Sequence, residues 1–269
     1  MTILLLSGIG NTGLPLARLL QEAKQSFLIA SRSPAKLPEP FKGVAFDWFN
    51  PSTYENPFKA DANIDRVYIV GPPVLDKLPQ TKDFVELAIA KGVKRFVLLS
   101  AAGTPRGGLL NGKVHEYLAE RGVDYAVLRP TWFNAVKQGL VASTVGNGKI
   151  AFVSADDVAA VAFRALVDEK SHNTEHIIVG PELHTYDEAA ALLSGVLGRT
   201  IIYKHLTHEE GKALFQSVPL PEDYAIALLG LEKQIADGEE ETHFHAEVKE
   251  VGKVHLKEYF EANREAFVA

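Results

Sequence analysis

The stretch Thr2–Gly13, TILLLSGIGNTG, decides the fold of the first part of the chain. Residues 3–6 are apolar and, with the β-tolerant Thr2 before them, predict a buried strand, and a helical pattern follows the last glycine. Between them lies a G-x-G-x-x-G motif. In this context the glycines allow a tight turn, a close approach of backbone N–H groups to a pyrophosphate, and close helix packing. The helix N-terminus adds its positive dipole end. We therefore expect a dinucleotide on Gly8, Gly10, Asn11, Thr12 and Gly13. The alternative is an ordinary strand-to-helix turn.

The end of the next expected strand, residues 27–30, indicates which dinucleotide binds. This strand runs into Ser31, Arg32 and Ser33, with no acidic residue. A site for NAD(H) places Asp or Glu here to hold the ribose hydroxyls, whereas an arginine accommodates a 2′-phosphate with two parallel hydrogen bonds. The sequence therefore predicts NADP(H), bound by these three residues. The alternative is that Arg32 is a solvated turn residue.

The rest of the chain alternates between strand and helix patterns, which favours an α/β fold of the Rossmann type with a doubly wound parallel sheet. After Gly180 and Pro181 the pattern becomes mostly helical. We therefore expect an NADP(H)-binding Rossmann domain over residues 1–180 and a smaller C-terminal substrate-binding lobe over residues 181–269. The expected strands are 44–47, 65–70, 95–100, 124–128, 176–179 and 201–203, and the expected helices include 78–91, 113–122, 158–167 and 185–197.

Ligands of open α/β sheets bind at the carboxyl ends of the strands. This rule predicts a site walled by residues 71–73, by residues 100–108, by residues 130–134 and by the C-terminal lobe, with Gly71 and Pro72 as cofactor contacts. Ser100 ends a strand here, so its hydroxyl is a candidate contact for substrate or ribose. The run from Gly107 to Lys113 is nearly a phosphate-binding P-loop. It lacks the hydroxyl that ligates magnesium, because Val114 stands at that position.

The composition excludes several classes of protein. The net charge is −6 and the pI about 5.9, which does not favour a nucleic-acid or membrane partner. No apolar run approaches membrane-spanning length, and the start of the chain lacks a basic region of the signal-peptide kind. There are no cysteines, which fits a cytoplasmic protein. His243 and His245 would share a face of a strand, but no third ligand accompanies them, so we expect no metal. The oligomeric state is left open.

Several segments together resemble the NmrA-like atypical short-chain dehydrogenase/reductase family, and within it the fungal alkaloid enzymes of the agroclavine dehydrogenase and festuclavine synthase type. They are GIGNTG, the basic SRS, the helix that begins with Lys113, LRPTWFN at 128–134, ADDVAAVAFRAL at 155–166 and IVGPELHTYDEAAALL at 178–193. The resemblance implies that Lys113 touches the cofactor ribose and the active site. It also implies that the segment with Pro130, Trp132 and Phe133 passes the nicotinamide.

One position departs from the usual pattern of short-chain dehydrogenases, which is Tyr-x-x-x-Lys. Leu109 stands four residues before Lys113, and leucine cannot donate a proton. Reduction of a ketone needs a proton on oxygen, whereas an iminium carbon accepts hydride and its nitrogen simply becomes neutral. An aromatic face stabilises such a cation, and Trp does so best. We therefore expect Lys113, Ser100 and Trp132 to be catalytic, with Phe133, Phe215 and Tyr224 as further aromatic candidates or plain core. We expect His115 and Glu116 to be exposed, and Asp157 to cap a helix.

The resemblance implies an NADP(H)-dependent oxidoreductase that reduces, or reversibly oxidises, an imine or iminium in fungal indole alkaloid biosynthesis. A cyclase variant, such as a redox-mediated Diels–Alder step, would extend the same chemistry. The expected partner is a small alkaloid-like substrate. The alternative is a non-catalytic NmrA-like regulator that senses NADP(H) and binds a partner protein.

Overall fold

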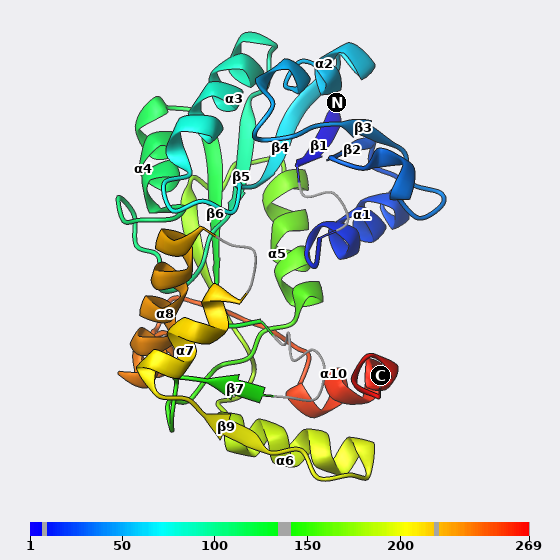
Figure 1. The fold of residues 1–269 in the computed structure, drawn as a ribbon. Helices are drawn as coiled ribbons and strands as arrows, with labels where there is room; N and C mark the ends of the chain where they lie inside the picture. Colours follow the sequence, from blue (N-terminus) through cyan, green and yellow to red (C-terminus); the bar gives the residue numbers. More distant parts are fainter. Residues whose placement is uncertain (7–9, 134–140, 218–220, 269) are drawn as a thin grey trace. The chain divides into compact units, whose positions relative to one another are not determined.

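The computed structural model describes residues 1–6, 10–133, 141–217 and 221–268 (Figure 1). The chain folds as two compact units. Unit 1 comprises Met1–Arg129 and Val158–His176, and unit 2 comprises Pro130–Asp157 and Ile177–Ala269. The expectation that residues 1–180 bind NADP(H) and residues 181–269 bind the substrate stays a prediction.

Eight strands form a sheet in the order β10-β8-β6-β5-β4-β1-β2-β3, which is the doubly wound order on both sides of β1. The predicted Rossmann-type parallel sheet is confirmed, because the registered pairs are parallel. The strands are β1 Thr2–Leu6, β2 Phe27–Ser31, β3 Gly43–Ala45, β4 Ile64–Val70, β5 Arg95–Leu99, β6 Asp124–Pro130, β8 Thr174–Val179 and β10 Glu250–Val251.

Helices cover both faces of the sheet in unit 1 (Figure 1). Alternate residues of β1, β4 and β5 pack with Phe84 of α3 and Leu118 of α4 in one apolar cluster. The opposite face meets α1, where the Tyr68 hydroxyl donates to Thr12 Oγ1 at 3.0 Å. Strands buried on both faces are almost continuously apolar, as in residues 3–6 of β1. The helices and 3₁₀ turns of this unit are α1 Gly13–Glu22, η1 Pro34–Lys36, η2 Pro51–Thr53, α2 Asn56–Ala60, α3 Leu78–Ala90, α4 Gly112–Arg121 and α5 Ala155–Val167, whose first three residues belong to unit 2.

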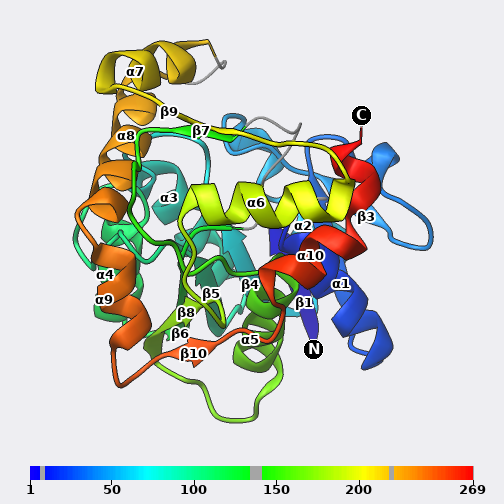
Figure 2. The same cartoon turned by 90° about the horizontal axis from the view of Figure 1, so that it is seen from below.

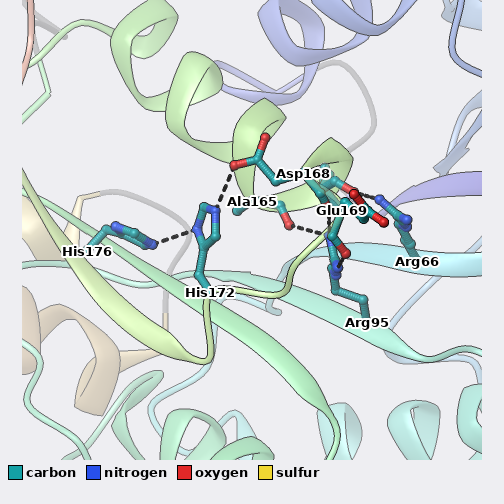
Figure 3. A network of polar contacts seen from close by, with 8 residues as sticks. Arg66, Arg95, Ala165, Asp168, Glu169, His172 and His176 are labelled. Carbon is teal, nitrogen blue, oxygen red and sulfur yellow. Dashed lines mark hydrogen bonds and ion pairs between the residues drawn. The ribbon is translucent and has the colours of Figure 1, made fainter.

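A polar network ties the end of α5 to the amino ends of β4 and β5 (Figure 3). Arg95 donates to the carbonyls of Asp168 at 2.6 Å and Glu169 at 3.0 Å, and Arg66 donates to Leu166. These carbonyls belong to or follow the last turn of a helix, where cations interact favourably with the dipole. The network therefore anchors α5 at the edge of the sheet opposite to the expected ligand site.

Unit 2 has its own apolar core, built around Phe152, Tyr186 and Phe260. Figure 2 shows α6 beside α10 in this unit. Thr185 caps the start of α6 and Thr207 caps the start of α7, each with a reciprocal capping box. The elements are β7 Val141–Ser143, α6 Tyr186–Leu197, β9 Tyr203–His205, α7 His208–Gln216, α8 Glu222–Ala236, α9 Glu239–His245, α10 Leu256–Ala262 and the 3₁₀ turn η3 Arg264–Phe267.

Several local expectations were wrong. His243 and His245 were expected to share a face of a strand. They lie on helix α9 instead, where residues two positions apart point to different faces. The strand expected at 201–203 is β9 at Tyr203–His205, and His115 is buried rather than exposed. Ser154, rather than Asp157, supplies the side-chain cap at the start of α5, accepting the Asp157 N–H at 3.0 Å. Within the described ranges, no helix is long and apolar enough to cross a membrane, and no three potential ligands gather to hold a metal.

Candidate functional site

Unit 1 contains a cavity of about 460 Å³ at the carboxyl ends of β1, β2 and β4. It lies where ligands of doubly wound sheets bind. Six of the residues predicted to bind a cofactor line it: Gly10, Ser31, Arg32, Ser33, Gly71 and Pro72. The other lining residues are Leu6, Ala30, Lys36, Phe46, Asp47, Trp48, Phe49, Val70 and Pro73.

One side of this cavity is basic. Arg32 and Lys36 follow β2, and Ser31 Oγ accepts the backbone N–H of Ser33 at 3.1 Å, which holds the turn. Arg32 is exposed and has no ion-pair partner within the described part of the chain. The single acid in the lining, Asp47, accepts the N–H of Phe49 at 3.0 Å. A guanidinium flanked by hydroxyls is the donor set that suits a phosphate.

The other side is aromatic and rigid. Trp48 packs edge-on against Phe46 with ring centres 4.9 Å apart, and its Nε1 donates to the carbonyl of Val70 at 3.0 Å. The indole also packs against Phe84 of α3. Trp48 is thus both core and cavity wall, and the core contacts fix it in place.

The glycine turn precedes α1. Gly8 lies outside the described residues. Gly10 lines the cavity and its carbonyl accepts the N–H of Leu14 at 3.2 Å, while Asn11 is exposed beside it. Thr12 is buried against Tyr68, and Gly13 is the buried first residue of α1. The described part of the motif therefore has the geometry of a turn that enters a helix next to the cavity.

A second polar group lies at the carboxyl end of β5. Ser100 is 7% exposed, and its Oγ has no hydrogen-bond partner in the described part of the structure. Asn111 donates through Nδ2 to the Leu99 carbonyl at 3.1 Å, and its Oδ1 is likewise buried without a described partner. Lys113 Nζ lies 2.6 Å from Asp76 Oδ2. Buried polar atoms are normally satisfied, so two orphans at this edge are consistent with a polar ligand.

The segment after β6 belongs to unit 2. The Trp132 N–H donates to Glu240 Oε1 at 2.8 Å, and the Ala151 N–H donates to Glu240 Oε2 at 3.0 Å. Burial raises the pKa of Glu240 to about 8. Phe133 forms a parallel bridge with Val153, and Pro130 is buried. Trp132 and Phe133 are thus held by their backbone in this unit.

Four residues near the candidate site or beside Trp132 were not predicted from the sequence: Asp76, Lys77, Asn111 and Glu240. Lys77 is 5% exposed, its Nζ donates to the carbonyl of Pro72, and burial lowers the pKa of this amine to about 8. Asp76 lies just before α3, where acidic residues are common, so the sequence could have indicated that its carboxylate binds the start of this helix. Glu240 is the middle residue of an acidic run, 239–241, and such runs are typical of solvent-exposed faces. The local sequence therefore does not indicate that Glu240 is buried.

The residues of unit 1 fit an NADP-type dinucleotide. Arg32 and the two serines offer donors for a 2′-phosphate, Gly10 allows close approach of a backbone, and the orphaned Ser100 and Asn111 offer partners for hydroxyls. The individual roles expected for these residues stay predictions.

Comparison with known proteins identifies the family. Residues 8–169 match the NAD(P)H-binding family model. Festuclavine synthase II of Penicillium roqueforti is 42% identical over 94% of each chain, and agroclavine dehydrogenase of Claviceps fusiformis is 38% identical over 93% of this chain and 92% of that one. An NADPH-dependent quinone oxidoreductase of Escherichia coli, solved with NADPH, shares the fold with a TM-score of 0.76 and 21% identity, over 97% of this chain and 99% of that one. The chain therefore belongs to the NAD(P)H-binding family and is an oxidoreductase of the group that includes festuclavine synthase and agroclavine dehydrogenase.

Proposed function

We propose that this protein uses NADP(H) to reduce, or reversibly oxidise, an imine or iminium intermediate of fungal indole alkaloid biosynthesis. Two observations support the proposal. Relatives at 38–42% identity are named for clavine alkaloids. The position of the usual proton donor holds Leu109, which is 55% exposed and aliphatic. A cyclisation coupled to the redox step would use the same site.

Leu109 is the observation that carries the choice of substrate. NADPH, when bound, supplies a hydride to the substrate carbon. A carbonyl substrate also needs a proton at oxygen in that step, and Leu109 cannot provide one. An iminium nitrogen needs none. The protein's own task is then to hold the cation, with Trp132 as the aromatic face, and to align it with the cofactor.

We propose these roles for the chain's other residues. Lys113 and Ser100 contact the nicotinamide ribose or the substrate, and Pro130 and Phe133 pass the nicotinamide. The 2′-phosphate binds to Arg32, and the remaining cofactor contacts come from Gly8, Gly10, Asn11, Thr12, Gly13, Ser31, Ser33, Gly71 and Pro72.

The substrate class is tested by matched compounds. NADPH consumption is measured with a cyclic indole iminium and with a ketone of the same skeleton. We expect turnover of the iminium and at least 100-fold slower turnover of the ketone, since general acid catalysis contributes roughly 10²–10⁴-fold. Equal rates on the two compounds would show that another group donates the proton and would remove the argument from Leu109.

The cofactor is tested by calorimetric titration of NADPH and NADH against wild type, Arg32→Ala and Arg18→Ala. Hydrogen bonds to a charged group are worth roughly 1.5–3 kcal/mol, so Arg32→Ala is expected to weaken NADPH binding about 10- to 100-fold and to leave NADH binding nearly unchanged. Arg18, exposed on α1, controls for loss of a surface charge. An unchanged NADPH preference in Arg32→Ala would contradict the assignment.

A further inference from the structure

Asp76 follows the loop of Gly71 and Pro72 in the chain and contacts Lys113 of α4. Its Oδ2 accepts from Lys113 Nζ at 2.6 Å, and its Oδ1 accepts the N–H of Leu78, the first residue of α3, at 3.1 Å. Its backbone also forms a bridge with Leu110, whose N–H donates to the carbonyl of Leu75 at 3.0 Å. The residue is therefore held at its backbone and at both carboxylate oxygens, although its side chain is 44% exposed.

Lys113 needs such a partner for two physical reasons. It is the second residue of α4, so its ammonium lies near the positive end of a helix dipole, which is unfavourable for a cation. Its long side chain also loses roughly 2 kcal/mol of rotamer entropy when it is held in one position. A fixed carboxylate offsets both effects. The same ammonium holds the pKa of Asp76 below its ordinary value.

We propose that Asp76 is the positioning residue of Lys113: it holds the ammonium at the carboxyl ends of β4 and β5, ready to contact the dinucleotide. The inference rests on the proposed role of Lys113 as a cofactor contact. Asp76 acts through Lys113 and does not itself touch the cofactor. Because the carboxylate is tied to the first turn of α3, it sets the ammonium at a fixed place relative to the loop of Gly71 and Pro72 that walls the cavity.

A second ion pair joins α3 to α4 and provides a control of similar exposure, although its carboxylate, Glu86, also accepts from the Tyr117 hydroxyl. Arg121 of α4 donates to Glu86 of α3 at 2.8 Å, with side chains 43% and 42% exposed. The Asp76–Lys113 pair has nearly the same exposure, 44% and 39%. Exposed pairs contribute only about 0–1 kcal/mol to stability. If both pairs merely tie the region of α3 to α4, breaking either one leaves cofactor binding unchanged.

The experiment measures the dissociation constant of NADPH by calorimetry for wild type, Asp76→Asn, Lys113→Met, the double variant and Glu86→Gln. We expect Asp76→Asn and Lys113→Met each to weaken binding about five-fold. The double variant should bind NADPH no more weakly than Lys113→Met alone, because the effects of substituting residues that act as a unit do not add. Glu86→Gln should bind as wild type does. Asp76→Glu, which keeps the charge on a longer side chain, should recover part of the loss. Thermal unfolding of each variant checks that the fold is retained.

The outcomes separate the inference from the function on which it rests. If Lys113→Met binds NADPH as tightly as wild type, the cofactor role of Lys113 falls, and the inference with it. If Lys113→Met binds weakly and Asp76→Asn binds like wild type, only the role of Asp76 is overturned. Tighter binding by Asp76→Asn would show that the carboxylate competes with the cofactor for the ammonium. Losses that add fully in the double variant would show that the two residues act independently.

Discussion

A buried lysine of unit 1 and a buried glutamate of unit 2 are exposed to the same extent, and their charges are opposite in sign. Lys77 in unit 1 and Glu240 in unit 2 are both 5% exposed. Burial lowers the pKa of Lys77 to about 8 and raises the pKa of Glu240 to about 8. Both shifts have the same cause, because removal from water disfavours the charged form of either group.

The partners of the two groups differ. Glu240 accepts two backbone N–H groups, from Trp132 and Ala151, so it ties together two segments of its own unit. Lys77 donates to the carbonyl of Pro72, which lines the cavity. An anionic dinucleotide in that cavity would bring negative charge toward the ammonium. We therefore interpret Glu240 as a structural clamp and Lys77 as a charge whose energy depends on the ligand.

The largest effect is expected from Glu240→Gln. A glutamine accepts at one atom only, so one of the two N–H donors loses its partner and meets an NH₂ group. An unsatisfied buried donor costs about 1–3 kcal/mol. We expect unit 2 to lose about 2 kcal/mol in free energy of unfolding. Each unit holds one of the two tryptophans, so urea unfolding followed by Trp132 fluorescence in a Trp48→Phe background reports on unit 2.

The pH dependence sharpens this test. The folded pKa of Glu240, about 8, lies above its ordinary value of 4.5, so the folded chain binds more protons between these limits. Stability from this group is present below pH 4.5 and is lost as the pH rises through 8. The difference between wild type and Glu240→Gln should therefore be largest near pH 5 and shrink toward pH 8. Glu239→Gln, one residue earlier on α9 and 42% exposed, is the control. If the difference in unfolding free energy between wild type and Glu240→Gln did not change with pH, the raised pKa of Glu240 would be contradicted.

The two units also differ in how much of them could be predicted from sequence. In unit 1, the glycine motif, the basic end of β2 and the rule that ligands bind at the carboxyl ends of strands predicted six residues that line the cavity, because turn chemistry and strand ends are local properties. The missing proton donor at Leu109 could be predicted because this position is defined by its spacing of four residues from Lys113. Glu240 could not be predicted, because its burial depends on contacts with Trp132 and Ala151, which lie about 90–110 residues earlier. The burial of Lys77 likewise depends on how the loop of Pro72 packs.

A smaller effect is expected from Lys77→Met, and it appears in ligand binding. The ammonium of Lys77 is charged below pH 8 and neutral above it, whereas a 2′-phosphate with a pKa of about 6 stays ionised throughout. NADPH affinity of wild type is therefore expected to fall about three-fold between pH 7 and 9.5, as the positive charge beside the cavity is lost. Lys77→Met should bind about three-fold more weakly at pH 7 and lack the component of the pH dependence that Lys77 contributes.

The measurement is NADPH binding followed by quenching of Trp48, which lines the cavity, in a Trp132→Phe background. Lys82→Met, an exposed lysine of α3, controls for the loss of a surface charge. Unfolding adds a check of sign: between pH 8 and 10.5 the unfolded chain binds more protons at residue 77, so stability from this group rises with pH in wild type and not in the variant. If the stability behaves so but NADPH affinity is identical in both proteins, Lys77 is a structural charge like Glu240. The contrast between the units would then disappear.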